Sequence, residues 1–158
     1  LTKEDQMKKL VTLIAVMTVA GLFSSADVLA QKGIMWKGGG GWGAATPYGR
    51  MYNPQTVETI IGEVVSVAQI TPMKSMHYGV HTVVKTDKET ISVHLGPGWY
   101  IENQEVKIAP KDKIEVKGSR ITFEGKPVII AAEVKKGDEV LMLRDASGFP
   151  VWSGWRRR

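Results

Sequence analysis

The sequence predicts an all-β domain, a small barrel of five to six strands with one short helix after the third strand. Short runs rich in Val, Ile and Thr recur between residues 56 and 144, and these residue types favour a pleated, half-buried surface. Turns containing Gly, Asp or Lys separate the runs at short intervals, as in all-β domains. The alternation of apolar and polar residues is lost after the third run, where Pro and Gly interrupt the chain.

The first three strands are expected at residues 56–70, 79–86 and 90–95. Gly62 lies near the middle of the first run, where a glycine often marks a bulge or a tight bend. A long first strand that bends in this way is what a small barrel requires. In the third run Ile91, Val93 and Leu95 share one face, and His94 lies on the other. We therefore expect the first face to point into the barrel.

Residues 96–98 (Gly-Pro-Gly) then interrupt the pattern, and residues 99–104 are expected to form a short helix or turn. Further strands are expected at residues 113–121, 128–135 and 140–144. Three strands, a short helix and then further strands are the order typical of the oligonucleotide/oligosaccharide-binding (OB) barrel. An immunoglobulin-like sandwich is the alternative, but it needs about seven strands and no helix at that point.

The first 30 residues are predicted to be a signal peptide with a short upstream extension. Lys8 and Lys9 precede an apolar run over residues 10–23, and Val28 and Ala30 fit the small-residue positions of a cleavage site. The apolar run has 14 residues, whereas a membrane-spanning helix needs about 20. We therefore expect cleavage after Ala30 and a periplasmic or secreted protein.

The rest of the chain is predicted to divide into a flexible, Gly- and aromatic-rich linker, the barrel, and a basic tail, at residues 31–51, 52–155 and 156–158. The chain has no cysteine, which excludes disulfides, thiolate metal sites and a cysteine nucleophile. Residues 51–155 carry 12 basic and 13 acidic residues, so the net charge of +5 comes from the two ends. A nearly neutral barrel argues against nucleic acid as a partner. Basic ends suit an acidic envelope protein or peripheral contact with an anionic membrane.

Aromatic side chains accompany these basic residues, and aromatic residues beside arginine are typical of interface anchors. The aromatics of the linker either contact a partner or dock onto the protein's own surface. Those after the third strand either contact a partner or cap the barrel as part of its core. The predicted partner-binding residues are Trp36, Trp42, Tyr48, Trp99, Tyr100, Trp155, Arg156, Arg157 and Arg158.

Two stretches carry a resemblance to known proteins. Residues 78–104 (YGVHTVVKTDKETISVHLGPGWYIENQ) and 125–155 (GKPVIIAAEVKKGDEVLMLRDASGFPVWSGW) resemble exported bacterial OB-fold proteins, a group often labelled "DNA-binding protein". The resemblance covers roughly residues 51–158 and implies an OB barrel without a catalytic motif.

The residues themselves also predict no enzyme. Asp112, Asp138 and Asp145 all stand in turn contexts, where aspartate commonly bonds to nearby backbone N–H groups. The function expected is a non-catalytic exported binding or interaction module, accessory to a periplasmic or envelope protein assembly. Binding of single-stranded nucleic acid or of an anionic polysaccharide stays open as an alternative.

A soft-metal site is a further alternative. Thioether and imidazole groups lie close together in the sequence, and such ligands suit Cu(I). The residues are Met73, Met76, His77, His81 and His94. They weakly resemble the ligands of the periplasmic copper-efflux chaperone, a small exported OB-fold protein that uses one His, two Met and a nearby Trp. In that family the methionines follow the histidine, whereas here they precede His94. We therefore expect no cofactor, with copper as the alternative. Without copper, the histidines would lie at the surface and the methionines would serve in ordinary packing.

Overall fold

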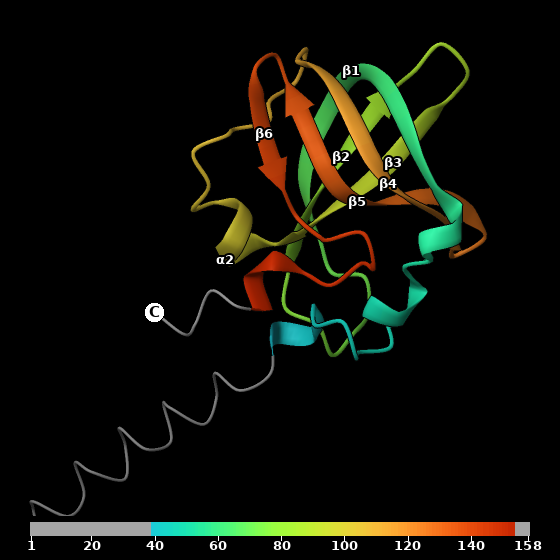
Figure 1. Ribbon diagram of the computed structural model, residues 1–158, viewed down its shortest axis with the longest axis vertical. Coiled ribbons are helices and arrows are strands. Elements are labelled where there is room, and N and C mark those ends of the chain that lie inside the picture. The colour runs from blue at the N-terminus through green and yellow to red at the C-terminus, as the bar shows by residue number, and fades with distance from the viewer. Residues whose placement is uncertain (1–38, 154–158) are drawn as a thin grey trace, which may run out of the picture. The chain divides into compact units, whose positions relative to one another are not determined.

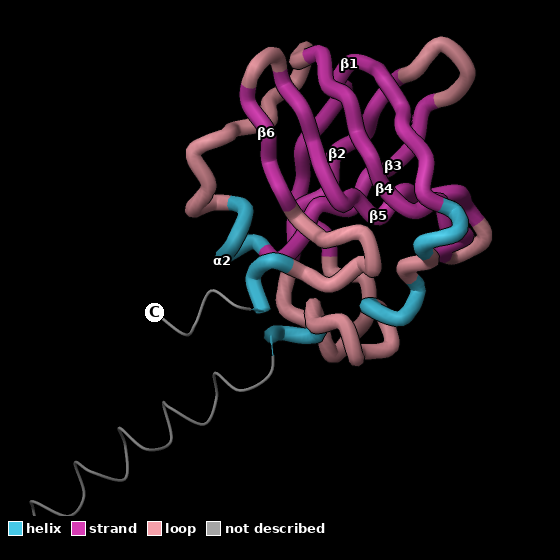
Figure 2. The backbone as a smooth tube through the Cα atoms, in the orientation of Figure 1, coloured by secondary structure: helices cyan, strands magenta, loops and turns pink. Residues whose placement is uncertain are grey.

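The strands of the structure, a computed structural model that describes residues 39–153, close on themselves (Figure 1). They are β1 (Val57–Ile70), β2 (Gly79–Lys85), β3 (Thr90–Pro97), β4 (Lys113–Phe123), β5 (Lys126–Lys136) and β6 (Glu139–Met142). Their hydrogen-bonded order is β3-β2-β1-β4-β5-β6, and a parallel pairing between β3 and β5 closes the first five into a barrel. One short α-helix, α2 (Gly98–Ile101), follows β3 in the described part of the chain (Figure 2). The predicted fold class is therefore confirmed.

β1 bends between two neighbours, as the sequence predicts. Its residues 57–63 pair with β4 and its residues 63–70 pair with β2, so one strand serves both halves of the barrel. Gly62 lies at the change of partner, where an added Cβ would lie 2.4 Å from the carbonyl oxygen of Lys85. The register of the pairing with β2 shifts between Val64 and Ser66. Glycine therefore permits the close approach of β2, and the bulge lies just beyond it.

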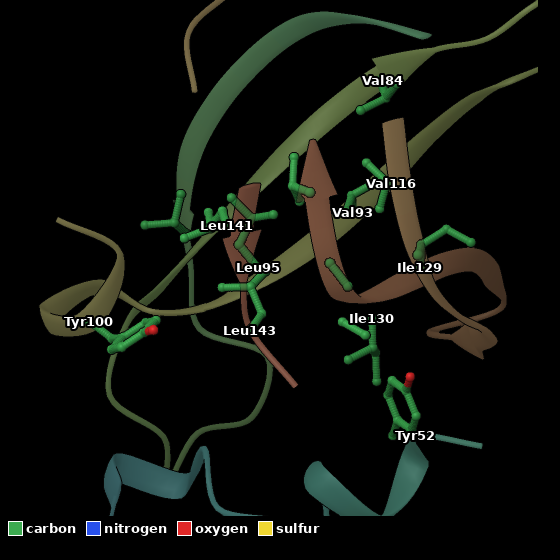
Figure 3. Close-up of a cluster of buried hydrophobic side chains, with 14 of the residues drawn as sticks. Tyr52, Val84, Val93, Leu95, Tyr100, Val116, Ile129, Ile130, Leu141 and Leu143 are labelled. Atoms are coloured by element: carbon green, nitrogen blue, oxygen red, sulfur yellow. The ribbon is translucent and has the colours of Figure 1, made fainter. Parts of the chain in front are cut away.

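The core is formed by the inward faces of the strands (Figure 3). Ile91, Val93 and Leu95 of β3 are buried, as their alternation predicts, and so are Ile114 and Val116 of β4. Side chains from strands that are distant in sequence meet there because the barrel closes through β3 and β5. The interior therefore follows the period of two that is visible in the sequence.

The segment before β1 packs against the barrel. It contains the short 3₁₀ helices η1 (Gly39–Gly41), η2 (Gly49–Met51) and η3 (Pro54–Thr56), and we call residues 39–56 the strap. Trp42 is 2% exposed, and its indole Nε1 donates to the carbonyl oxygen of His77 over 2.9 Å. Tyr48 is 1% exposed. For residues 39–51 the structure thus replaces the predicted flexible linker with ordered packing.

Residues 144–153, which we call the C-terminal segment, are attached to the strap by Trp152 and to the barrel by Arg144. The indole Nε1 of Trp152 donates to the carbonyl oxygen of Trp42 over 3.1 Å. The buried guanidinium of Arg144 lies 4.8 Å from the Trp152 ring centroid and donates to the carbonyl oxygens of Leu95 and Ala131. Its contacts among the described residues include no carboxylate. Arg144 therefore joins β3, β5 and the C-terminal segment through hydrogen bonds and ring contact alone.

The predicted signal peptide at residues 1–30 and the basic tail at residues 156–158 lie outside the described residues. Residues 39–153 belong to one compact unit. Across this described range, no helix is both long enough and apolar enough to cross a membrane.

Candidate functional site

An apolar groove of about 350 Å³ opens between α2, the loop that follows it and the end of the sheet. This volume lies within the range of ligand pockets, which is about 300–1,000 Å³. We call it the α2–β6 groove. It is lined by Val67, Ala68, Gln69, Val80, Leu95, Ile101, Glu102, Val106, Lys107, Ile108 and Leu141.

The end of the sheet creates this groove. β6 is the last strand in the sheet order. Among residues 39–153 it pairs only with β5, so no described strand lies beside its other edge. Leu141 points inward and is buried, whereas its neighbours Val140 and Met142 are exposed. The Tyr100 hydroxyl of α2 donates to the carbonyl oxygen of Met142 over 3.4 Å. Figure 3 shows Leu95 and Leu141 close together, with Tyr100 on α2 nearby. Both leucines line the groove.

Two charged side chains, Glu102 and Lys107, stand at the rim and are held by hydrogen bonds. The Glu102 carboxylate accepts hydrogen bonds from the Tyr78 hydroxyl over 3.0 and 3.1 Å. The Lys107 ammonium donates to the carbonyl oxygen of Glu102 over 2.7 Å, and it makes no ion pair within residues 39–153. Lys136 holds the loop in place through the Lys107 carbonyl oxygen, at 2.8 Å, and Asp112, at 2.9 Å. The rim thus carries one negative and one positive side chain, and neither makes an ion pair among the described residues.

A larger hollow of about 710 Å³ lies beside β1, the β2–β3 turn and β4. Its main charged groups already neutralise one another, because Arg120 donates to Glu58 at 2.7 Å and also to Glu89. The hydrogen bond from Arg120 also lowers the pKa of Glu89. The α2–β6 groove is therefore the better candidate for a binding site.

The α2–β6 groove was not predicted from the sequence. Residues 105–112 lie between the predicted short helix and the next predicted strand and carried no prediction. Ile101, Val106 and Ile108 nevertheless stand in an otherwise polar stretch. These three side chains are half-buried and pack against the core. Apolar residues in a loop were the available signal, but only the fold places them opposite Leu141.

The predicted partner-binding aromatics are mostly used for packing. Trp42 and Tyr48 are buried in the strap, which agrees with docking onto the protein's own surface rather than with a free binding strip. Tyr100 is buried too, and Trp99 is half-buried beside it, with 6.0 Å between ring centroids. The remaining members, Trp36, Trp155, Arg156, Arg157 and Arg158, lie outside the described residues.

The structure brings two of the five proposed metal ligands together. His81 and His94 oppose each other in the pairing of β2 with β3, with 6.2 Å between their ring centroids. The Nδ1 atom of His81 is 2.9 Å from the Ser92 hydroxyl, and the Nδ1 atom of His94 is 2.9 Å from the Tyr48 hydroxyl. One ring nitrogen of each histidine is therefore already hydrogen-bonded.

The other three proposed ligands have separate surroundings. Met76 is buried beside Gly41, where an added Cβ would lie 2.5 Å from the Met76 Cγ atom. Met73 packs against the core, and His77 is exposed near Gly40. Residues 39–153 contain no group of three or more His, Cys, Asp or Glu side chains suited to a metal ion. Copper binding stays a prediction from the sequence, and these placements assign the methionines to packing.

Burial makes His94 a pH-sensitive element of stability. The strap residue Tyr48 and Phe123 of β4 cover its ring, with 5.5 Å between the centroids of His94 and Phe123. Burial, followed by the charges of His81 and Arg144, lowers the pKa of His94 from 6.5 to about 4. The folded protein therefore binds a proton at His94 less readily than the unfolded chain does.

We expect the free energy of unfolding to fall as the pH drops from about 6.5 to about 4, by at most about 1.4 kcal/mol per pH unit from this residue. The contribution of neutral His94 to stability is fully present above its pKa in the unfolded chain, because the imidazole is then neutral in both the folded and the unfolded protein. Urea unfolding of the wild type and of His94→Phe across this range measures it. The variant should show the weaker pH dependence, and exposed His77→Gln serves as the control. Parallel curves for the wild type and His94→Phe would contradict the assignment.

Comparison with known proteins identifies the family. No curated protein matches the chain. The family model described as the MamS/MamX magnetosome protein family matches residues 56–141, which is more than half of the 158 residues. The matched range runs from the start of β1 into β6 and contains every residue that lines the α2–β6 groove. Neither the group labelled "DNA-binding protein" nor the copper-efflux chaperone is among the matches. The chain belongs to the MamS/MamX magnetosome protein family.

Proposed function

We propose that the protein is a non-catalytic binding module, exported from the cytoplasm, that serves as an accessory component of a magnetosome-associated protein assembly in the cell envelope. The family match supports the association with magnetosomes. The observation that carries the binding role is the α2–β6 groove, an apolar pocket built from residues inside the matched range.

The lining of the groove suits binding more than chemistry. Most of its side chains are apolar, and its one carboxylate, Glu102, is held by the Tyr78 hydroxyl. General acid–base catalysis needs titratable groups within reach of the reacting atoms. Lys107 is the other charged side chain in the lining beside Glu102. Burying one apolar side chain of a partner there would contribute about 1.5–3 kcal/mol. Holding an apolar group of another protein is therefore the role that we assign to it.

The chain ends are a second part of the proposal. Residues 31–50 carry three basic residues and no acidic residue, and residues 156–158 are all arginine. We assign to these residues, together with Trp36 and Trp155, a contact with an acidic protein or membrane surface outside the cytoplasm. Cleavage after Ala30 would release the mature chain there.

Site-specific crosslinking in a magnetosome-forming bacterium tests the proposal. A photo-reactive amino acid replaces Val106 in the groove or, as the control, exposed Thr122 on β4. Isolated magnetosomes should yield a discrete protein adduct from position 106 and none from position 122, because only the first lines the groove. The proposal fails if the protein is missing from the magnetosome fraction, or if both positions give the same adducts.

A further inference from the structure

We propose that the Arg144 guanidinium binds one chloride ion in a small pocket between the strap and the C-terminal segment. This pocket shares no lining residue with the α2–β6 groove. Three properties lead to the inference: a buried positive charge that meets no carboxylate among the described residues, the N–H donors that this charge has to spare, and the size and neutrality of the pocket.

The charge of Arg144 is buried. The residue is 5% exposed, and within residues 39–153 its hydrogen bonds go to backbone carbonyl oxygens and to no carboxylate. Burial lowers the pKa of its guanidinium from the usual value. A charge that leaves water is costly unless a counter-charge and hydrogen bonds replace the water. An anion beside the guanidinium would provide both.

The side edge of the guanidinium has donors to spare. Arginine has five N–H donors, and here the Nη1 atom donates to the carbonyl oxygens of Leu95 and Ala131. In the described part of the chain, the Nε and Nη2 atoms of Arg144 meet no acceptor. Residues 39–153 contain no sealed side-chain nitrogen without a partner, so these two atoms open onto accessible space. Together they form the planar fork with which arginine binds anions.

The pocket beside Arg144 is small and otherwise neutral. Its volume of about 10 Å³ accommodates roughly one water-sized particle, so sulfate and phosphate are too large. Arg144 is the one charged residue in its described lining. Tyr48 and Tyr52 line the same pocket, and the Arg144 charge opposes the rise in pKa that burial causes in both hydroxyls. The guanidinium therefore stands close to this pocket.

Two other arrangements fit the charge less well. Arg144 also lines an outer hollow of about 290 Å³, but the carboxylates of Glu133 and Asp145 stand in that lining and would repel an anion. A water molecule fits the inner pocket, yet it would leave the buried charge without a counter-charge. A monatomic anion in the inner pocket meets both the size and the charge.

The ion would hold two segments together. The strap contributes Tyr48 and Tyr52 to the pocket, and the C-terminal segment contributes Gly148 and Pro150. The two segments approach closely, because an added Cβ at Gly148 would lie 2.3 Å from the Cδ1 atom of Tyr52. The pocket exists only in the folded chain, so chloride binding should stabilise the folded state.

Urea unfolding of the full chain tests the inference. Sodium chloride replaces sodium gluconate, whose anion is too large for the pocket, at constant ionic strength. Between about 20 and 200 mM chloride the folding equilibrium constant should rise about threefold to tenfold, as expected for a dissociation constant of about 1–80 mM. Arg144→Met should lose this response. Arg120→Gln is the matched control, because Arg120 pairs with Glu58, and it should respond like the wild type.

Crystals of the wild type grown in sodium chloride give a second measurement, which does not depend on the folding of a variant. Data collected at long wavelength should show an anomalous peak beside the Nε and Nη2 atoms of Arg144, because chlorine scatters anomalously there and the oxygen of water does not. A water molecule alone at this position would overturn the inference. So would wild-type stability that does not change with chloride, or an equal chloride response of Arg144→Met and the wild type.

Discussion

Replacing Trp42 with alanine is expected to lower the free energy of unfolding by about 3–5 kcal/mol, the usual cost of removing a buried tryptophan side chain. The ring fills the space above Gly79, where an added Cβ would lie 2.1 Å from it. It also packs edge-on against Tyr48, with 5.0 Å between ring centroids. The substitution therefore removes ring contacts between the strap and β2, together with the hydrogen bond to His77.

Urea unfolding measures this effect, with Phe149→Ala as the matched control. Phe149 is also a large aromatic residue, but it is 53% exposed, so its loss should change the free energy by about 0.5 kcal/mol or less. The comparison also examines the strap as a structural element. If residues 39–51 were an independent linker, Trp42→Ala would behave like Phe149→Ala.

Replacing Arg144 with alanine is expected to cost a similar amount, about 3–5 kcal/mol. The carbonyl oxygens of Leu95 and Ala131 would each lose a charged donor, and an unsatisfied buried polar group costs about 1–3 kcal/mol. The Trp152 ring would also lose the guanidinium against which it packs. Because these contacts join β3, β5 and the C-terminal segment, their loss should destabilise the whole barrel.

Arg144→Lys distinguishes charge from geometry in the same measurement. A lysine keeps the positive charge and N–H donors, but its ammonium lacks the planar guanidinium that packs on the Trp152 ring. We expect its stability to lie between that of the wild type and that of Arg144→Ala. Exposed Lys126→Ala is the control for removing a positive charge, and it should have little effect. Equal stability of Arg144→Lys and the wild type would show that only the charge matters.

The period of two along the strands was sufficient to predict the barrel and much of its core. Ile91, Val93 and Leu95 are buried as their alternation indicates. The same pattern left His94 on the opposite face without saying what lies there. In the structure the Tyr48 side chain, 46 residues earlier, covers it. Local periodicity reports which face a side chain takes, because neighbouring strand residues point to opposite faces, but it does not report what packs on that face.

The candidate site was predictable only in fragments. The apolar character of Ile101, Val106 and Ile108 is plain in the sequence, and so is the charge of Lys107. These side chains line one groove with Leu141 because β6 is the last strand of the sheet and the loop after α2 lies opposite it. Trp42 and Tyr48 were predicted to bind a partner because they are aromatic residues near basic ones, yet both are buried in the core.

By itself the sequence determined the all-β class, the order of the elements, the bend in β1 and the near-neutral charge of the barrel, since composition and local alternation carry these properties. The packing of the strap, the surroundings of the histidines and the α2–β6 groove became visible in the folded structure. Each of these depends on contacts between distant residues, such as the bonds that join Trp42 to His77 and to Trp152, 35 and 110 residues away. The physical reason is that burial depends on the closed packing of the whole chain, whereas a sequence pattern reports the preference of each short segment.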